Sequence, residues 1–81
     1  MKRIVWTDLA RADVRKLSKP EAMHVFSTLL RFSESGLGDV KALQGEEELR
    51  LRVGDYRLFF VRPNADTIEV RRVRHRGEAY R

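Results

Sequence analysis

Four residues near the end of the chain, His75-Arg76 and Tyr80-Arg81, have side chains suited to cleaving a phosphodiester. Histidine exchanges protons near neutral pH, arginine stabilises the charge of a phosphorane, and tyrosine transfers a proton when nearby cations lower its pKa. RNA carries its own nucleophile, the 2′-hydroxyl, so its cleavage needs only a base, an acid and cationic support. Residue types alone leave two interpretations equally open: a metal-free ribonuclease centre, or an unstructured basic tail.

More arginines lie on an alternating segment that starts at Leu49. Apolar and cationic residues alternate up to Val53, and Gly54-Asp55 is a two-residue hairpin turn signal. This turn pairs Val53 with Tyr56 and gives the hairpin two different faces. The core face consists of Leu49, Leu51, Val53, Tyr56, Leu58 and Phe60. The opposite face consists of Arg50, Arg52, Arg57 and Phe59.

The arginine-bearing side of this hairpin suits an RNA backbone. Alternate side chains on a strand are about 6.6 Å apart, close to the spacing of nucleotide phosphates. Arg52 opposite Arg57 destabilises an empty sheet, but a bound anion offsets that cost. Phe59 adds an apolar surface on which a base can stack. The alternative is a solvated face whose arginine stems cover Phe59, but three arginines together with an aromatic ring favour binding.

The distribution of charge indicates the same class of ligand. Residues 50–81 contain 9 arginines and 4 acidic residues, which gives the whole net charge of +5. Residues 1–49 contain 8 basic and 8 acidic residues and hold all 4 lysines. Arginine grips phosphate through two parallel hydrogen bonds and stacks on bases, whereas lysine offers a point charge. The pattern predicts a phosphate or nucleic-acid ligand, with Arg72, Arg74 and Arg81 as further RNA-binding candidates.

The neutral half of the chain predicts a strand and two helices. Lys2 to Trp6 is a short apolar strand, and Thr7 caps a helix from Asp8 to about Leu17. Its expected core residues are Leu9 or Ala10, then Val14 and Leu17. Asp13 is expected on the outer face of this helix and is assigned no chemistry.

The second helix is predicted from Pro20 to about Ser35. Ser18 to Glu21 has the capping-box pattern with proline in the first turn, and Gly36 ends the helix. Its expected core residues are Ala22, Met23, Phe26, Leu29 and Leu30. Gly36 to Glu48 is predicted to form a loop, with Leu43 in the core.

A third strand of the arginine-rich half is predicted from Thr67 to about Arg74. A bulge near Arg71-Arg72 would return Val73 to the core face, and residues 75–81 are expected to form a short polar tail. Strands gathered after helices indicate an α+β fold. We expect one domain, residues 1–81, in which an N-terminal strand and a helical hairpin precede a three-stranded antiparallel meander packed on the helices.

Composition excludes several classes of protein. The chain has 0 cysteines, so it has neither a disulfide framework nor a thiolate metal site. It has 2 histidines with no ligand spacing, so no metal or other cofactor is expected. No apolar run is long enough to span a bilayer and no signal-peptide pattern is present, so we expect a cytoplasmic location and no membrane partner.

The sequence resembles the RelE/ParE superfamily of toxin–antitoxin toxins, and most closely its RelE branch. The resemblance covers essentially the whole chain and is carried by four groups of residues. These are Trp6-Thr7 with Ala10 and Leu17, Leu43-Gln44-Gly45, the block from Leu49 to Leu58, and Val73-Arg74-His75-Arg76 followed by Tyr80-Arg81.

The resemblance implies a RelE-like fold and a metal-independent mRNA interferase that cuts the codon in the ribosomal A site by 2′-hydroxyl attack. It implies catalytic roles for Arg50, Arg57, Arg76 and Tyr80, RNA contacts from Arg52, and His75 as a possible acid or base. It also implies a cognate antitoxin, through which any link to DNA is indirect.

Two features depart from one well-known member of the RelE branch. That member has a basic residue two positions before the equivalent of Arg50, where this chain has Glu48, and its segment corresponding to Arg76–Tyr80 is longer. Two other functions remain open. One is a ParE-like inhibitor of DNA gyrase, although such proteins generally lack the strand arginines and terminal tyrosine as a set. The other is a non-catalytic RNA-binding module.

Overall fold

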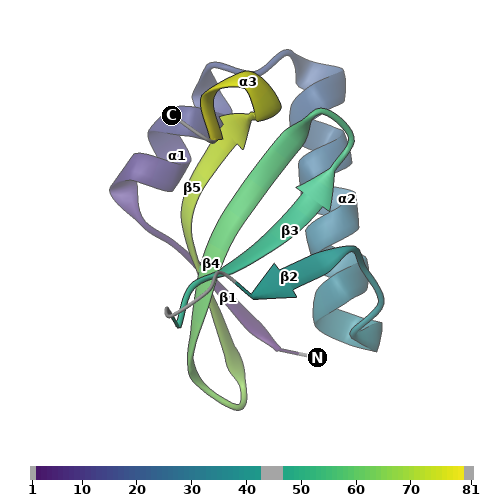
Figure 1. Ribbon diagram of the computed structural model, residues 1–81, viewed down its shortest axis with the longest axis vertical. Helices are drawn as coiled ribbons and strands as arrows, with labels where there is room; N and C mark the ends of the chain where they lie inside the picture. The colour runs from purple at the N-terminus through teal and green to yellow at the C-terminus, as the bar shows by residue number, and fades with distance from the viewer. Residues whose placement is uncertain (1, 43–46, 80–81) are drawn as a thin grey trace.

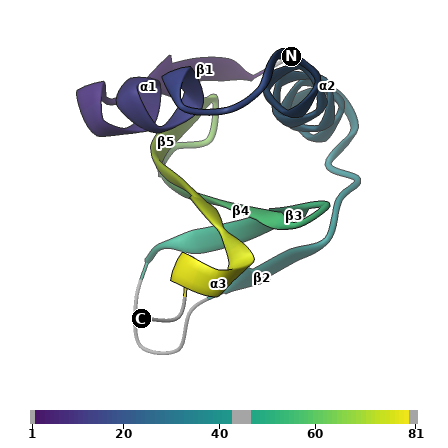
Figure 2. The same cartoon turned by 90° about the horizontal axis from the view of Figure 1, so that it is seen from above.

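The computed structural model describes residues 2–42 and 47–79. The prediction that Leu43 lies in the core falls outside these residues. A five-stranded sheet forms one layer, and two helices cover one of its faces (Figures 1 and 2). The elements are β1 (Arg3–Trp6), α1 (Asp8–Arg15), α2 (Lys19–Ser35), β2 (Val40–Ala42), β3 (Leu49–Val53), β4 (Tyr56–Asn64), β5 (Thr67–His75) and α3 (Arg76–Ala79). No helix in the described part of the chain is long and apolar enough to cross a membrane.

The α+β class and the order of strand, two helices and strands are confirmed, but the predicted three-stranded meander is wrong. The sheet order is β1-β5-β4-β3-β2, and β1 pairs with β5 in parallel while the other pairs are antiparallel. β2 lies in the segment predicted as a loop, where its three residues are too short to show alternation. In the segment predicted as a polar tail, residues 75–81, His75 ends β5 and residues 76–79 form a short helix, α3.

The predicted helix boundaries are confirmed to within a few residues. The hydroxyl of Thr7 accepts a hydrogen bond from the Ala10 backbone N–H at 3.2 Å, and Ser18 and Glu21 form the reciprocal capping box. Gly36 ends α2 in the left-handed conformation, with φ 74°, which glycine adopts without steric cost.

The predicted core face of α2 is wrong in its rotation about the helix axis. Leu29 is buried as expected, but its buried companions are Val25, Thr28, Phe32 and Ser33. Met23, Phe26 and Leu30 keep 57%, 42% and 46% of their surface. The helix is apolar on more than one side, so periodicity alone could not select the side that packs on the sheet. In α1, Ala10 is the core residue and Leu9 is exposed.

The predicted hairpin register and the bulge are both confirmed. Val53 pairs with Tyr56, Arg52 with Arg57 and Arg50 with Phe59. Between β4 and β5, Phe60 pairs with Val70 whereas Phe59 pairs with Arg72, so Arg71 is an extra residue. This insertion returns Val73 to the core, where it keeps 5% of its surface.

Asp13 was predicted on the outer face of α1, and that prediction is wrong. Its side chain is 8% exposed and accepts two hydrogen bonds from Arg72, at 2.8 and 3.2 Å, and one from the backbone N–H of Val73, at 2.9 Å. β1 stops pairing with β5 at Val70, so the edge of β5 is open beyond that point. Asp13 satisfies a backbone donor on this edge directly after the bulge.

Burial raises the pKa of Asp13, but the hydrogen bonds from Arg72 and Val73 outweigh burial and hold that pKa below its usual value. Thr7 reinforces the same junction, because its hydroxyl donates to the Arg71 carbonyl at 3.1 Å. Together these contacts fasten α1 to β5 where the strand changes register.

Asp13→Asn is expected to lower the free energy of unfolding by about 2 kcal/mol at neutral pH, because charge-assisted hydrogen bonds contribute roughly 1.5–3 kcal/mol. Chemical denaturation measures this loss. A carboxyl group whose pKa is lowered by folding stabilises the fold above its unfolded pKa, and this effect is lost as pH falls through the folded pKa. The gap between wild type and variant should therefore shrink below about pH 4. A gap that stayed constant down to about pH 3 would contradict this assignment.

Candidate nucleic-acid interface

The side of β3, β4 and β5 turned away from α1 and α2 carries two cross-strand rows of mainly cationic residues. We call this side the arginine face. One row consists of Arg52, Arg57 and Arg74. The next row consists of Lys41, Arg50, Phe59 and Arg72. Alternation along the strands produces this grouping, because Leu51, Val53, Leu58 and Val73 point the other way into the core.

The first row differs in how firmly its side chains are held. Nη1 of Arg57 donates to the carbonyl oxygens of Gly54 and Tyr56, at 3.1 and 3.0 Å, so the turn of the hairpin positions its guanidinium. Arg52 is 58% exposed and lies 4.0 Å from the equally exposed Asp39. Such a pair is weak in water, so Arg52 can turn towards an incoming anion at little cost.

In the second row, two residues predicted to bind RNA, Phe59 and Arg72, are less accessible to a ligand than the sequence indicated. Arg72 is bound by Asp13, so its charge is largely neutralised and its guanidinium is directed towards α1. Phe59 retains 9% of its surface and therefore offers no open surface for base stacking. Lys41 was not predicted, because it lies on the short β2 strand within the expected loop; its alignment with Arg50 across β2 and β3 required the sheet.

His75 and Arg76 lie on different sides of the sheet. His75 pairs with Tyr56 on the side that faces the helices, and the two rings meet edge to face at 5.4 Å. Its Nδ1 accepts the Gly77 backbone N–H at 3.2 Å. Arg76 opens α3, which lies beyond the arginine face in Figure 2, and its guanidinium is 4.0 Å from Asp55 in the hairpin turn. Tyr80 and Arg81 fall outside the described residues.

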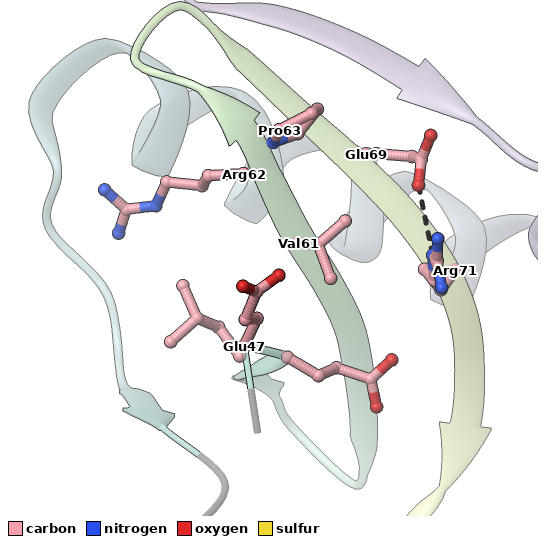
Figure 3. Close-up of a pocket in the computed structure, with 8 residues that line it drawn as sticks. Glu47, Val61, Arg62, Pro63, Glu69 and Arg71 are labelled. Atoms are coloured by element: carbon pink, nitrogen blue, oxygen red, sulfur yellow. Dashed lines mark hydrogen bonds and ion pairs between the residues drawn. The ribbon is translucent and has the colours of Figure 1, made fainter. Parts of the chain in front are cut away.

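The far end of the same sheet side has the opposite charge. An open depression of about 990 Å³ is bordered there by Glu69 on β5, Val61 on β4, and Glu47 and Glu48 just before β3. Glu69 binds Arg71 at 3.0 Å, and Arg62 points away from that pair (Figure 3). The carboxylates disfavour phosphate, so a nucleic-acid backbone is directed towards the arginine end although the depression is spacious.

Glu21 belongs to a smaller network on the side of the sheet that faces the helices. It accepts the Ser18 backbone N–H at 2.9 Å and the Tyr56 hydroxyl at 2.9 Å. Hydrogen bonds from Ser18 and then Tyr56 lower the pKa of Glu21. Among the residues described here, no group of three or more His, Asp or Glu side chains is placed to hold a metal ion.

The family described as "ParE toxin of type II toxin-antitoxin system, parDE" matches residues 4–80. No curated protein matches the sequence.

Several solved toxin structures are similar. RelE in the RelB-RelE antitoxin-toxin complex from Methanococcus jannaschii is 25% identical, with 94% of each chain covered and a TM-score of 0.76. The archaeal RelE-RelB complex from Pyrococcus horikoshii OT3 is 21% identical, with a TM-score of 0.77. The match covers 96% of this chain and 98% of the Pyrococcus chain. The intact E. coli RelBE complex gives 20% identity, 90% and 94% coverage, and a TM-score of 0.69.

Arg52→Ala is expected to change the free energy of unfolding by less than about 0.5 kcal/mol, because its ion pair with Asp39, the one it forms among the described residues, is exposed and weak. The same change should lower the affinity for single-stranded RNA several-fold and reduce the salt dependence of binding by about one counterion. Arg31→Ala, which removes an exposed arginine from α2, is the control. Equal RNA affinities of the two variants across a salt titration would remove Arg52 from the interface.

Proposed function

We propose that this chain acts as an endoribonuclease. It belongs to the ParE toxin family of the RelE/ParE superfamily and is therefore a toxin of a type II toxin–antitoxin system. In this proposal it cuts mRNA in the ribosomal A site by attack of a 2′-hydroxyl on the neighbouring phosphodiester, and so inhibits translation. The reaction requires no metal, because the nucleophile belongs to the RNA.

The observation that carries this proposal is the row of Arg52, Arg57 and Arg74 across three strands. Like charges that face each other on neighbouring strands cost stability, by up to about 1 kcal/mol per pair. A surface that keeps three guanidinium groups in one row, with Arg50 and Lys41 in the next, supports binding of a polyanion. Single-stranded RNA satisfies that requirement and also supplies the nucleophile.

The proposed roles follow from how each side chain is held. Arg57 is positioned by the hairpin turn and is assigned to the scissile phosphate, together with Arg50. Arg76 begins α3, which lies on the side of the sheet away from α1 and α2 (Figure 2), and it is assigned to the charge that develops in the transition state. Tyr80 is assigned to proton transfer by the superfamily resemblance. His75 is not assigned to proton transfer, because it pairs with Tyr56 on the opposite side.

The proposed partners are a cognate antitoxin and the ribosome with mRNA in its A site. The RelE toxins from Methanococcus jannaschii and Pyrococcus horikoshii were both crystallised with RelB. By analogy, an antitoxin that binds this chain would neutralise it. Any DNA contact is expected through the antitoxin.

Inhibition of DNA gyrase is the second candidate, because the matching family carries the ParE name. The two functions are separated by inducing the toxin without an antitoxin and examining two targets. Codon-aligned new 5′ ends in translated mRNA support the ribonuclease. Inhibition of supercoiling by purified gyrase, with mRNA left intact, would replace it.

Arg57→Ala and Arg76→Ala are each expected to abolish growth arrest and to lower mRNA cleavage by at least about 100-fold, the effect of removing one transition-state donor. Arg57 donates to two backbone carbonyl oxygens and Arg76 lies 4.0 Å from an exposed carboxylate, so neither change removes a buried ion pair and the fold should survive. Arg31→Ala should remain toxic. Thermal unfolding checks the fold, and a folded Arg57→Ala protein that still cleaves mRNA would refute its assignment.

Tyr80→Phe is expected to reduce cleavage strongly while leaving RNA affinity within about twofold, because only the hydroxyl is removed and the ring is retained. Single-turnover cleavage on programmed ribosomes, together with direct binding, measures the two effects separately. Loss of affinity with an unchanged cleavage step would instead assign the tyrosine to stacking.

A further inference from the structure

A second polar pocket lies on the edge of β5 beyond the end of β1, and we call it the β5-edge pocket. Its volume is about 270 Å³. Lys16 borders it from the end of α1, His75 and Tyr56 from the side of the sheet that faces the helices, and Arg74 from the arginine face. Because its lining comes from both sides of the sheet, the pocket passes round the strand edge. The arginine face therefore continues into it through Arg74.

Most of the charged side chains that border the β5-edge pocket are cationic, namely Lys16, Arg72 and Arg74. Asp13, the one carboxylate among the described residues that border the pocket, is paired with Arg72 and also lies within the electrostatic reach of Lys16. Lys16 is exposed, and its ammonium forms no ion pair with any residue that the structure describes. Glu21, the carboxylate that contacts Tyr56 nearby, already accepts hydrogen bonds from Ser18 and the tyrosine.

His75 borders the pocket and can supply a hydrogen-bond donor. Its Nδ1 accepts the Gly77 N–H, so the neutral ring carries its proton on Nε2. The imidazole lies perpendicular to the Tyr56 ring, with the two ring centroids 5.4 Å apart. Because Lys16 and His75 border the same pocket, a phosphate group bound there has an ammonium and an imidazole among its neighbours.

We propose that the β5-edge pocket binds the RNA backbone phosphate adjacent to the one that is cleaved. The RNA strand then leaves the arginine face round the edge of β5 and passes between Lys16 and His75. The identity of the ligand rests on the proposed function, whereas the pocket and its charge do not. A passage that opens to both sides of a sheet suits a continuous backbone better than a free anion.

The test uses a 2′-O-methylated RNA pentanucleotide, which cannot be cleaved, and the corresponding dinucleotide. Lys16→Ala should weaken pentanucleotide binding by about fivefold and lower its salt dependence by about one counterion, because one phosphate contact is lost. Dinucleotide binding should change by less than about twofold, because the shorter RNA does not reach round the edge. Arg31→Ala is the control and should leave both affinities unchanged.

A second measurement uses the wild-type protein and therefore does not depend on how a variant folds. The ¹⁵N resonance of His75 Nε2 should shift when the pentanucleotide is added and should stay in place with the dinucleotide. An unshifted His75 resonance, or a Lys16→Ala protein that matches Arg31→Ala, overturns the proposal. A Lys16→Ala effect on inorganic phosphate but none on the pentanucleotide would indicate a free-anion site and also overturn it.

These binding measurements do not depend on whether the protein cleaves RNA. If Arg57→Ala still cleaves mRNA on the ribosome while Lys16→Ala loses pentanucleotide affinity, the catalytic assignment fails and the phosphate site stands. If cleavage requires Arg57 but Lys16→Ala binds normally, the catalytic assignment stands and the path of the RNA round β5 is wrong.

Discussion

The arrangement of this molecule depends on the burial of every second residue along the β3–β4 hairpin. Leu51, Leu58 and Phe60 are fully buried and Val53 nearly so, and each pairs across the hairpin with another residue of the core side. Sliding the hairpin by one residue would exchange its two sides completely, moving these side chains into water and the arginines into the core. The register is therefore set by apolar burial, and the cationic rows follow from it without any contact between the arginines themselves.

In β5, a β-bulge keeps the apolar side chains on the core side and the arginines on the other side. Val70 and Val73 must both face the core, although three residues of separation put them on opposite sides of a regular strand. The extra residue Arg71 resolves the conflict, and Asp13 accepts the backbone N–H exposed beside it. The position of Arg74 next to Arg57 thus depends on a carboxylate from α1, and α1 takes part in building a surface that it does not itself form.

The strands were more predictable from sequence than the helices' packing. Strict alternation and a glycine–aspartate turn admit a single hairpin register, which the structure confirms. The three-residue β2 strand and the parallel β1–β5 pair depend on contacts between distant segments, which periodicity does not report. Asp13 was misplaced for a related reason: helical spacing assigns it to the outside, and only the open edge of β5 explains its burial. Phe59 was correctly placed on the cationic side, but its exposure could not be judged from its position.

The number of arginines in the sequence and their positions in the fold indicate different candidate sites. Nine arginines in one half of the chain suggest a uniformly basic surface. In the fold, Arg72 is neutralised by Asp13 and Arg71 by Glu69, while Glu47 and Glu48 give the far end of that side a negative character. Arg52, Arg57, Arg74 and Arg76 lie instead beside the hairpin turn and the start of α3. A polyanion bound there has carboxylates at one end and the basic β5 edge at another, so electrostatics favours a backbone that crosses the strands towards β5 over one that runs along them.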